Sequence, residues 1–267
     1  MKKNIAISLF SLTLILFSTQ SCKEGEGPNI FSVQDDMEFG MQVNQEIENN
    51  AQEYNIIDPA QYPEAYQHLR RIRDSILNTG LVDYDEKFVW EVNLLKNDTV
   101  LNAFATPGGY LYFYTGLVKF LDNEAEFAGV MGHEMAHSAE RHSTEQLTRV
   151  YGLQVLLSVV LGEDPGMIAQ IAADLAAGLT MLAFSRNHEN DADEFAVKYL
   201  YATSYDARGV AGFFQKLEGA PRPPEFLSTH PSPENRVEDI LAMWEALGGK
   251  EGNYYVDSYN QFKNSLP

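Results

Sequence analysis

The sequence predicts an α+β domain that is mostly helical and carries a small β-hairpin or sheet near its N-terminus. Two observations support this prediction. Segments rich in β-branched and aromatic residues are confined to residues 88–114, whereas the segments after Thr115 have the apolar spacing of helices. With 267 residues, of which 45% are hydrophobic and 21% charged, the chain has the composition of a globular protein. One strand-containing layer followed by a helical body favours a single domain.

Two helices are expected before the strands. Apolar residues recur at helical spacing over Asp35–Ala51. Asp58 is a candidate N-cap for a second helix over Pro59–Asn78, and Gly80 is a natural end for it.

Three strands are expected next. They cover Phe88–Leu95, Val100–Thr106 and Tyr110–Tyr114, and the sequence Pro107-Gly108-Gly109 predicts a tight turn between the last two. The second and third strands should therefore form an antiparallel hairpin.

The rest of the chain is predicted to be helical. Asn123 is a candidate cap, with Glu126 at the capping-box position, for a helix that runs to about Glu145. Further helices are expected over Gln146–Leu161, Gly166–Phe184, Glu189–Tyr201, Arg208–Leu217 and Glu234–Leu247. The segment Gly166–Phe184 is hydrophobic enough to raise the question of a membrane span. Gln170 and Asp174 interrupt it and no basic flanks support spanning, so a buried helix is the favoured interpretation.

The N-terminus resembles a bacterial lipoprotein signal. Two lysines precede the apolar segment Ile5–Phe17, which is too short to cross a bilayer, and Cys22 follows shortly after it. We expect residues 1–21 to be a signal peptide, Cys22 to be lipidated, residues 22–34 to be a flexible tether and residues 35–267 to form the folded domain. An ordinary secretory signal beside a chance Cys is the alternative. Lipidation would place the protein in the cell envelope, on the outer membrane, facing the periplasm or the cell surface.

Charge and cysteine content exclude several classes of protein. The chain has 19 Lys and Arg against 38 Asp and Glu, a formal charge of −19, so it would repel the phosphates of a nucleic acid. A single Cys excludes an intramolecular disulfide framework and a Cys-rich zinc module.

The motif His133-Glu134-Met135-Ala136-His137 indicates a metal site. On a helix, residues four apart lie on one face, so both imidazoles can reach one metal ion. The carboxylate of Glu134 can then take a proton from water that zinc has activated. The alternative to a metal site is that both histidines lie on the surface and bind no metal.

A catalytic zinc site needs a third protein ligand. The metzincin continuation is excluded because Glu140 and Ser143 stand where Gly and His would be required. Glu189 and Asp193 share a helix face, so Glu189 could bind the metal while Asp193 accepts the N–H of a ligating His. His188 is a competing third ligand, but it has only Ala192 one turn further on.

These motifs resemble peptidase family M48, over roughly residues 35–247. The similar segments are Asn102–Tyr110, Thr115–Leu117, Asn123–Glu126, the His133–His137 motif, Ser185–Asp193 and Thr229–Pro233 with Arg236. The resemblance implies a zincin-like, gluzincin-type metalloprotease domain and a zinc metalloendopeptidase with one Zn²⁺ per chain. It also implies His133, His137 and Glu189 as metal ligands and Glu134 as general base. Small lipoprotein members of the family are associated with quality control of envelope proteins.

Three further residues are harder to interpret from sequence. His142 lies five positions after His137, about 140° away on a continuous helix, which indicates a structural role. His230 lies in a loop that carries a fourth, inhibitory zinc ligand in some relatives, and it is equally well explained as a loop residue without metal contact. Arg236 could orient this loop or bind substrate backbone.

Two other functions compete with peptidase activity. One is a catalytically silent, membrane-tethered chaperone or adaptor, against which the intact His133, Glu134, His137 and Glu189 argue. The other is a zinc esterase, against which the predicted hairpin argues, since an exposed strand suits an extended polypeptide.

Overall fold

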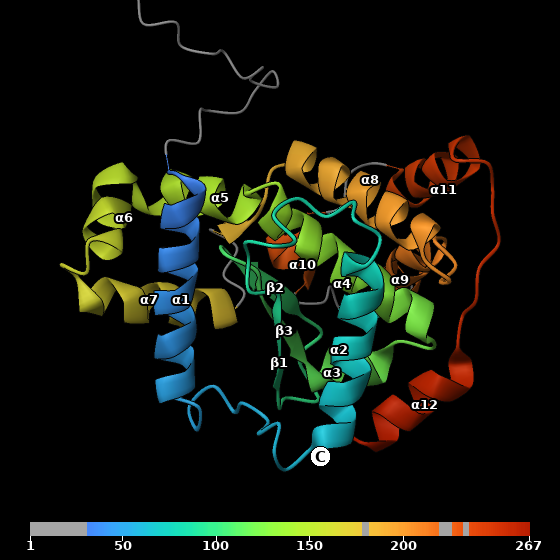
Figure 1. Ribbon diagram of the computed structural model, residues 1–267, viewed down its shortest axis with the longest axis horizontal. Helices are drawn as coiled ribbons and strands as arrows, with labels where there is room; N and C mark the ends of the chain where they lie inside the picture. Colours follow the sequence, from blue (N-terminus) through green and yellow to red (C-terminus); the bar gives the residue numbers. More distant parts are fainter. Residues whose placement is uncertain (1–30, 178–181, 219–225, 232–234) are drawn as a thin grey trace, which may run out of the picture. The chain divides into compact units, whose positions relative to one another are not determined.

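The computed structural model describes residues 31–177, 182–218, 226–231 and 235–267. The predicted signal segment, Cys22 and most of the tether lie outside these residues. The described part confirms the α+β class, with a small mixed sheet among many helices (Figure 1).

The two helices before the sheet begin where their capping chemistry dictates. Helix α1 (Val33–Asn49) starts after Ser32, whose side chain and that of Asp35 form a reciprocal capping box. Helix α2 (Pro63–Leu77) starts four residues later than predicted. Pro63 favours the first helical position and disfavours helix in the residue before it, so the Asp58 side chain closes a turn instead.

The sheet has the order β1-β3-β2, with β1 (Glu91–Leu95), β2 (Ala103–Thr106) and β3 (Tyr110–Tyr114). Strands β2 and β3 form the predicted antiparallel hairpin, whose turn glycines have φ of 77° and 90°. Strand β1 pairs parallel to β3, a pairing that was not predicted. It begins at Glu91 because Trp90 has a left-handed backbone with φ of 49°.

Side chains alternate between the two faces of the sheet, and each face is covered by helices. Phe104, Tyr112 and Tyr114 belong to a cluster with α1 and the helices of residues 142–176. Ala105, Phe113 and their neighbours belong to a second cluster with α2 and the central helices. This alternation follows from the two-residue period of a strand.

The helical body follows the sheet. It consists of α3 (Thr115–Phe120), α4 (Glu124–Ala139), α5 (His142–Tyr151), α6 (Leu153–Val160), α7 (Pro165–Ala176), α8 (Arg186–Ala202), α9 (Gly209–Glu218), α10 (Phe226–Thr229), α11 (Arg236–Ala246) and α12 (Val256–Asn264). Helices α3, α10 and α12 were not predicted as separate elements.

Two predicted long helices are interrupted. The helix expected over Asn123–Glu145 ends at Ala139, because Arg141 has a left-handed backbone with φ of 64°. The helix expected over Gln146–Leu161 is divided at Gly152, whose φ is 82°. The prediction of a continuous helix was therefore wrong in both places. The apolar residues keep their helical spacing on either side of a single left-handed residue, so the pattern does not reveal the break.

Helix α4 is the centre of the body, and every residue from Glu124 to Ala139 is buried. Its glycines allow neighbouring helices to approach. A Cβ on Gly129 would lie 2.9 Å from the backbone of Val210 on α9, so a side chain there would push the two helices apart.

The hydrophobic segment Gly166–Phe184 is not one continuous helix. Helix α7 covers its first half and buries Ile168, Ile171 and Ala172 on one face, and residues 178–181 lie outside the described part. Among the described helices none could cross a bilayer alone; α6 and α7 together have the required length and composition but meet at a bend of 112°.

Candidate metal centre

Helix α4 presents the two imidazoles of the His-Glu-x-x-His motif to one point. The Nε2 atoms of His133 and His137 lie 3.1 Å apart, and both side chains are buried. One turn of helix separates the two residues, as the spacing predicts.

Helix α8 brings the carboxylate of Glu189 to the same point. Its oxygens lie 3.5 Å from His133 Nε2 and 3.4 Å from His137 Nε2. The side chain of Ser185 caps the N-terminus of α8. His188, the competing candidate, is not part of this group; its ring stacks on His142 instead.

His230, which follows α10, completes a cluster of four. Its Nδ1 lies 3.0 Å from Glu189 Oε1 and 3.4 Å from His133 Nε2. Zinc bonds of about 2.0–2.1 Å in a tetrahedron separate ligand atoms by about 3.3–3.4 Å. The distances given above, 3.0–3.5 Å, are close to this value, so the cluster has donor types and spacing suited to one metal ion.

Glu134 lies beside the cluster with its carboxylate fully buried. Within the described part of the chain neither of its oxygens accepts a hydrogen bond, and Oε1 lies 3.4 Å from His230 Nε2. Burial raises the pKa of this carboxyl. A buried carboxylate without such partners fits a site that also holds water or an ion.

The protonation equilibria of the cluster are coupled by burial and close charges. Burial lowers the pKa of His137 well below its ordinary value. For His133 burial acts in the same direction, but hydrogen bonds that its ring donates to Asp193 and Glu189 outweigh burial and raise the pKa to about 9. For Glu189 burial raises the pKa, but His230 and Arg236 outweigh that effect and hold it well below the ordinary value.

Asp193 and Arg236 form a second layer around the cluster. Asp193 Oδ1 lies 2.9 Å from His133 Nδ1, one helical turn after Glu189. Arg236 on α11 donates two hydrogen bonds of 2.7 Å to Asp193 and lies 3.0 Å from Glu189 Oε2. Its guanidinium also lies over the ring of Phe214. Arg236 thus contacts the carboxylates of the site. The sequence alone did not predict these partners.

The expected direction of His142 was wrong, although it lies outside the cluster of four and its structural role stays a prediction. Its Nδ1 lies 3.2 Å from Nδ1 of His137. The angle of 140° assumed a continuous helix, whereas the left-handed Arg141 turns the chain back toward α4. His142 therefore contacts the ring nitrogen of His137 that faces away from the cluster.

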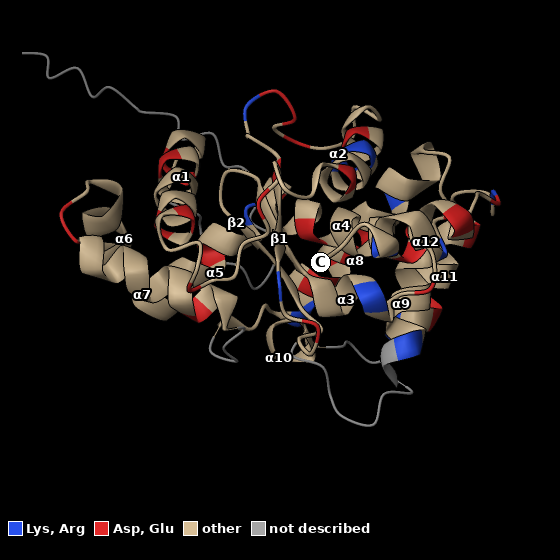
Figure 2. Cartoon of the chain, turned by 90° about the horizontal axis from the view of Figure 1, so that it is seen from below, with Lys and Arg blue, Asp and Glu red and all other residues tan. Residues whose placement is uncertain are grey.

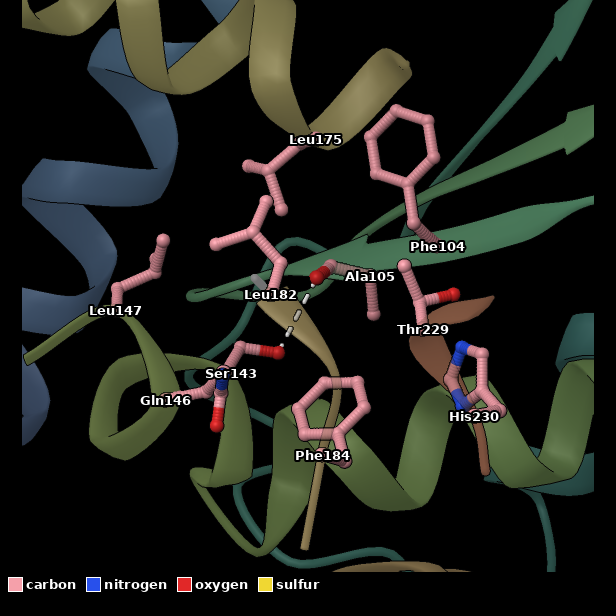
Figure 3. A pocket seen from close by; sticks show the side chains of 10 residues that line it. All are labelled: Phe104, Ala105, Ser143, Gln146, Leu147, Leu175, Leu182, Phe184, Thr229 and His230. Carbon is pink, nitrogen blue, oxygen red and sulfur yellow. Dashed lines mark hydrogen bonds between the residues drawn. The ribbon is translucent and has the colours of Figure 1, made fainter. Parts of the chain in front are cut away.

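A largely apolar pocket adjoins the cluster and shares His230 with it (Figure 3). Its cavity volume is about 20 Å³, enough for about one water molecule, so the pocket is nearly closed in this structure. Strand β2 contributes Phe104 and Ala105, and Phe184 stacks on His137 at a centroid distance of 3.8 Å. Phe184 was not predicted as a site residue, and its position directly before the Ser185-Arg186 motif was the available signal.

The family model described as "Peptidase family M48" matches residues 63–244 of this chain. The chain belongs to peptidase family M48. The match includes every residue of the metal cluster and of its second layer, and in this M48 chain they come from α4, α8, α11 and the end of α10.

Similar M48 relatives occur in bacteria and in mitochondria. A Vibrio cholerae protein assigned as a beta-barrel assembly-enhancing protease is 31% identical over 204 residues, 67% of this chain and 42% of that protein. The beta-barrel assembly-enhancing protease of Escherichia coli K12 is 32% identical over 159 residues, which are 55% of this chain and 32% of that protein. The mitochondrial metalloendopeptidase OMA1 of Arabidopsis thaliana is 33% identical over 168 residues, which are 61% of this chain and 34% of that protein. The chain spans less than half the length of these three relatives.

Proposed function

We propose that this chain is a zinc-dependent metalloendopeptidase that hydrolyses peptide bonds with Glu134 as general base. The observation that carries the proposal is the buried Glu134 carboxylate beside a tetrahedral set of His and Glu donors. His133, His137 and Glu189 would hold the ion, one per chain. The family membership supports the same conclusion.

When bound, Zn²⁺ supplies Lewis-acid polarisation and lowers the pKa of water for attack. Glu134 takes the proton of the attacking water and can pass it to the leaving amine. Asp193 holds the His133 ring by its Nδ1–H, which leaves Nε2 for the metal. Arg236 pairs with both Glu189 and Asp193, so its guanidinium places a positive charge beside the two carboxylates and holds them in position.

Substrates are proposed to be polypeptides in extended form. Strand β2 is an edge strand of the sheet and belongs to the wall of the pocket beside the cluster. A substrate segment could pair with this edge as an added strand once the hydroxyls of Ser138 and Ser143, which donate to the carbonyls of Thr106 and Ala105, are displaced. The pocket would then receive a side chain next to the cleaved bond, and its leucine and phenylalanine walls favour an apolar one.

The proposal is tested by removing and restoring the metal. The purified chain should contain about one Zn²⁺, consistent with the four donors of the cluster. A strong chelator should abolish cleavage of unfolded casein, and stoichiometric Zn²⁺ should restore the initial rate. Cleavage that persists in metal-free protein, as verified by elemental analysis, would contradict the proposal.

We further propose that His230 keeps the enzyme in a resting state. With its Nδ1 on the ion, its Nε2–H faces the carboxylate of Glu134. One ring would then fill the fourth coordination position of the metal and also block the general base. His133, His137, Glu189 and His230 are each at most 1% exposed, which leaves no path for a polypeptide. Hydrogen bonds from Phe226 N to Leu101 O and from Phe184 N to Thr229 O hold this arrangement.

Substituting His230 with Ala should raise the basal initial rate on unfolded casein several-fold at matched zinc occupancy. The expected cause is the release of the fourth position and of Glu134, while three ligands retain the ion. His68→Ala, a substitution on α2 outside the site, is the control and should leave the rate unchanged. A His230→Ala rate at or below that of the wild type would assign His230 to substrate binding or loop structure.

We propose that the protein is a lipoprotein of the bacterial cell envelope that acts on misfolded envelope proteins. The apolar segment before Cys22 supports the anchor, and two bacterial relatives are named for beta-barrel assembly. Cys22→Ala should move the protein from the membrane fraction to the soluble envelope fraction. Retention of this variant in the membrane after a salt wash would assign the anchor to another segment.

A further inference from the structure

Helix α6 exposes a row of leucines to solvent. Leu153, Leu157 and Leu161 are 38%, 43% and 68% exposed, and their spacing of four places them along one side of the helix and its C-cap. The opposite side buries Leu156 and Val159 in the cluster beneath. The exposed leucines are therefore not needed to cover the core, and we call them the α6 stripe.

Helix α6 itself carries no charged residue, although the protein is strongly acidic. Residues 150–162 contain no Lys, Arg, Asp or Glu, although the chain carries 57 such residues in total. Figure 2 shows α6 without acidic or basic colour, in contrast to the helices at the other end of the molecule. The acidic Glu163 and Asp164 follow directly in the turn before α7. An apolar row of this kind marks a surface that is covered in the working protein.

Helices α6 and α7 lie together at the end of the described part that is farthest from α11 and α12, in both views (Figures 1 and 2). Both contact α1, and Gln42 of α1 donates a hydrogen bond to the carbonyl of Val160. Helix α1 is also the element through which the N-terminal segment of the chain enters the domain. The α6 stripe thus adjoins the helix to which any N-terminal anchor is connected.

We propose that the α6 stripe inserts into the interfacial region of a phospholipid bilayer, as a second contact beside the N-terminal segment. The length of the connecting chain supports this occupant. Eight residues separate Cys22 from Phe31, and an extended chain over these nine steps spans at most about 32 Å. The inference rests on the lipid anchor proposed above for Cys22: with that anchor, the link holds the domain within reach of the membrane, where a short apolar helix face can enter the headgroup boundary.

Charge determines which lipids this surface accepts. A protein of net charge −19 is repelled by anionic headgroups, and Glu163 and Asp164 lie directly beside the α6 stripe. The proposed surface is therefore one of zwitterionic lipid, such as phosphatidylethanolamine. Anionic lipid should weaken the contact, and salt should reduce that effect by screening.

The experiment places an environment-sensitive fluorophore on the α6 stripe of the full chain. Leu157→Cys is introduced into the full chain with lipidated Cys22, whose thiol is already blocked as a thioether, so that only the introduced thiol reacts with the label. The labelled protein is reconstituted with phosphatidylethanolamine–phosphatidylcholine vesicles that carry a spin-labelled lipid. Leu81→Cys and Leu247→Cys are matched controls, since these leucines are exposed to 47% and 39% elsewhere on the surface. We expect quenching at position 157 to exceed that at both controls at least twofold. Added phosphatidylglycerol at low salt should reduce it.

Equal quenching at all three positions would overturn the proposal. A blue shift of the label at position 157 that depends on protein concentration and needs no vesicles would also overturn it, because a second copy would then cover the stripe. Neither readout depends on cleavage, so failure of the proposed peptidase activity leaves this test intact. The triple variant Leu153→Gln, Leu157→Gln and Leu161→Gln should still cleave soluble casein at the wild-type rate.

Discussion

Replacing Glu134 with Gln should lower the rate of casein cleavage by about 10²–10⁴-fold, the contribution expected of a positioned general base. The amide has nearly the shape of the carboxylate but cannot take a proton from water. Because the oxygens of Glu134 accept no hydrogen bond within the described residues, the substitution removes no bond that holds the fold. Zinc content and melting temperature should therefore stay close to those of the wild type.

Glu140→Gln is the matched control, since Glu140 follows the same helix at its C-terminal end. This variant should keep the wild-type rate. Equal rates in the wild type and in Glu134→Gln would remove Glu134 from the chemistry. If the wild-type protein holds zinc and cleaves nothing, the function as a tethered chaperone or adaptor becomes the better explanation.

Replacing Glu189 should have its largest effect on metal retention. Glu189→Ala removes the only carboxylate ligand and leaves Arg236 without one of its two buried partners, and breaking such a pair typically costs 3–5 kcal/mol. Glu189→Gln keeps the shape and can still hydrogen-bond, so it separates metal loss from unfolding. Both variants should lose zinc on dialysis, as measured by elemental analysis together with circular dichroism.

A graded comparison distinguishes ligands from residues that orient them. Asp193→Asn should weaken zinc affinity by about 10–100-fold, which is typical for a group that orients a ligating His. Glu189→Gln should weaken it more, because a metal bond is lost. The exposed Glu194→Gln on the same helix should leave affinity unchanged. Zinc retention by Glu189→Gln equal to that of the wild type would show that Glu189 is not a ligand.

The order of elements and the pair of histidines could be predicted because both depend on local periodicity. The spacing of four in the His133–His137 motif places both rings on one helix face wherever that helix packs. The hairpin around Gly108-Gly109 is similarly local, since it depends on residues that tolerate positive φ. Apolar spacing could not reveal the breaks at Arg141 and Gly152, because one left-handed residue reverses the direction of the chain without altering the pattern on either side.

By itself the sequence determined that this protein has an α+β body, a His-Glu-x-x-His helix and a later acidic segment that could supply another ligand. Only the tertiary structure decided which distant side chains meet them. His230 reaches His133 across 97 positions of sequence, Arg236 joins Asp193 to Glu189, and His142 contacts His137. Such contacts depend on how helices α4, α8 and α11 pack and on the backbone reversal at Arg141. The physical reason is that local spacing sets the face on which a side chain lies, whereas packing sets what that face meets.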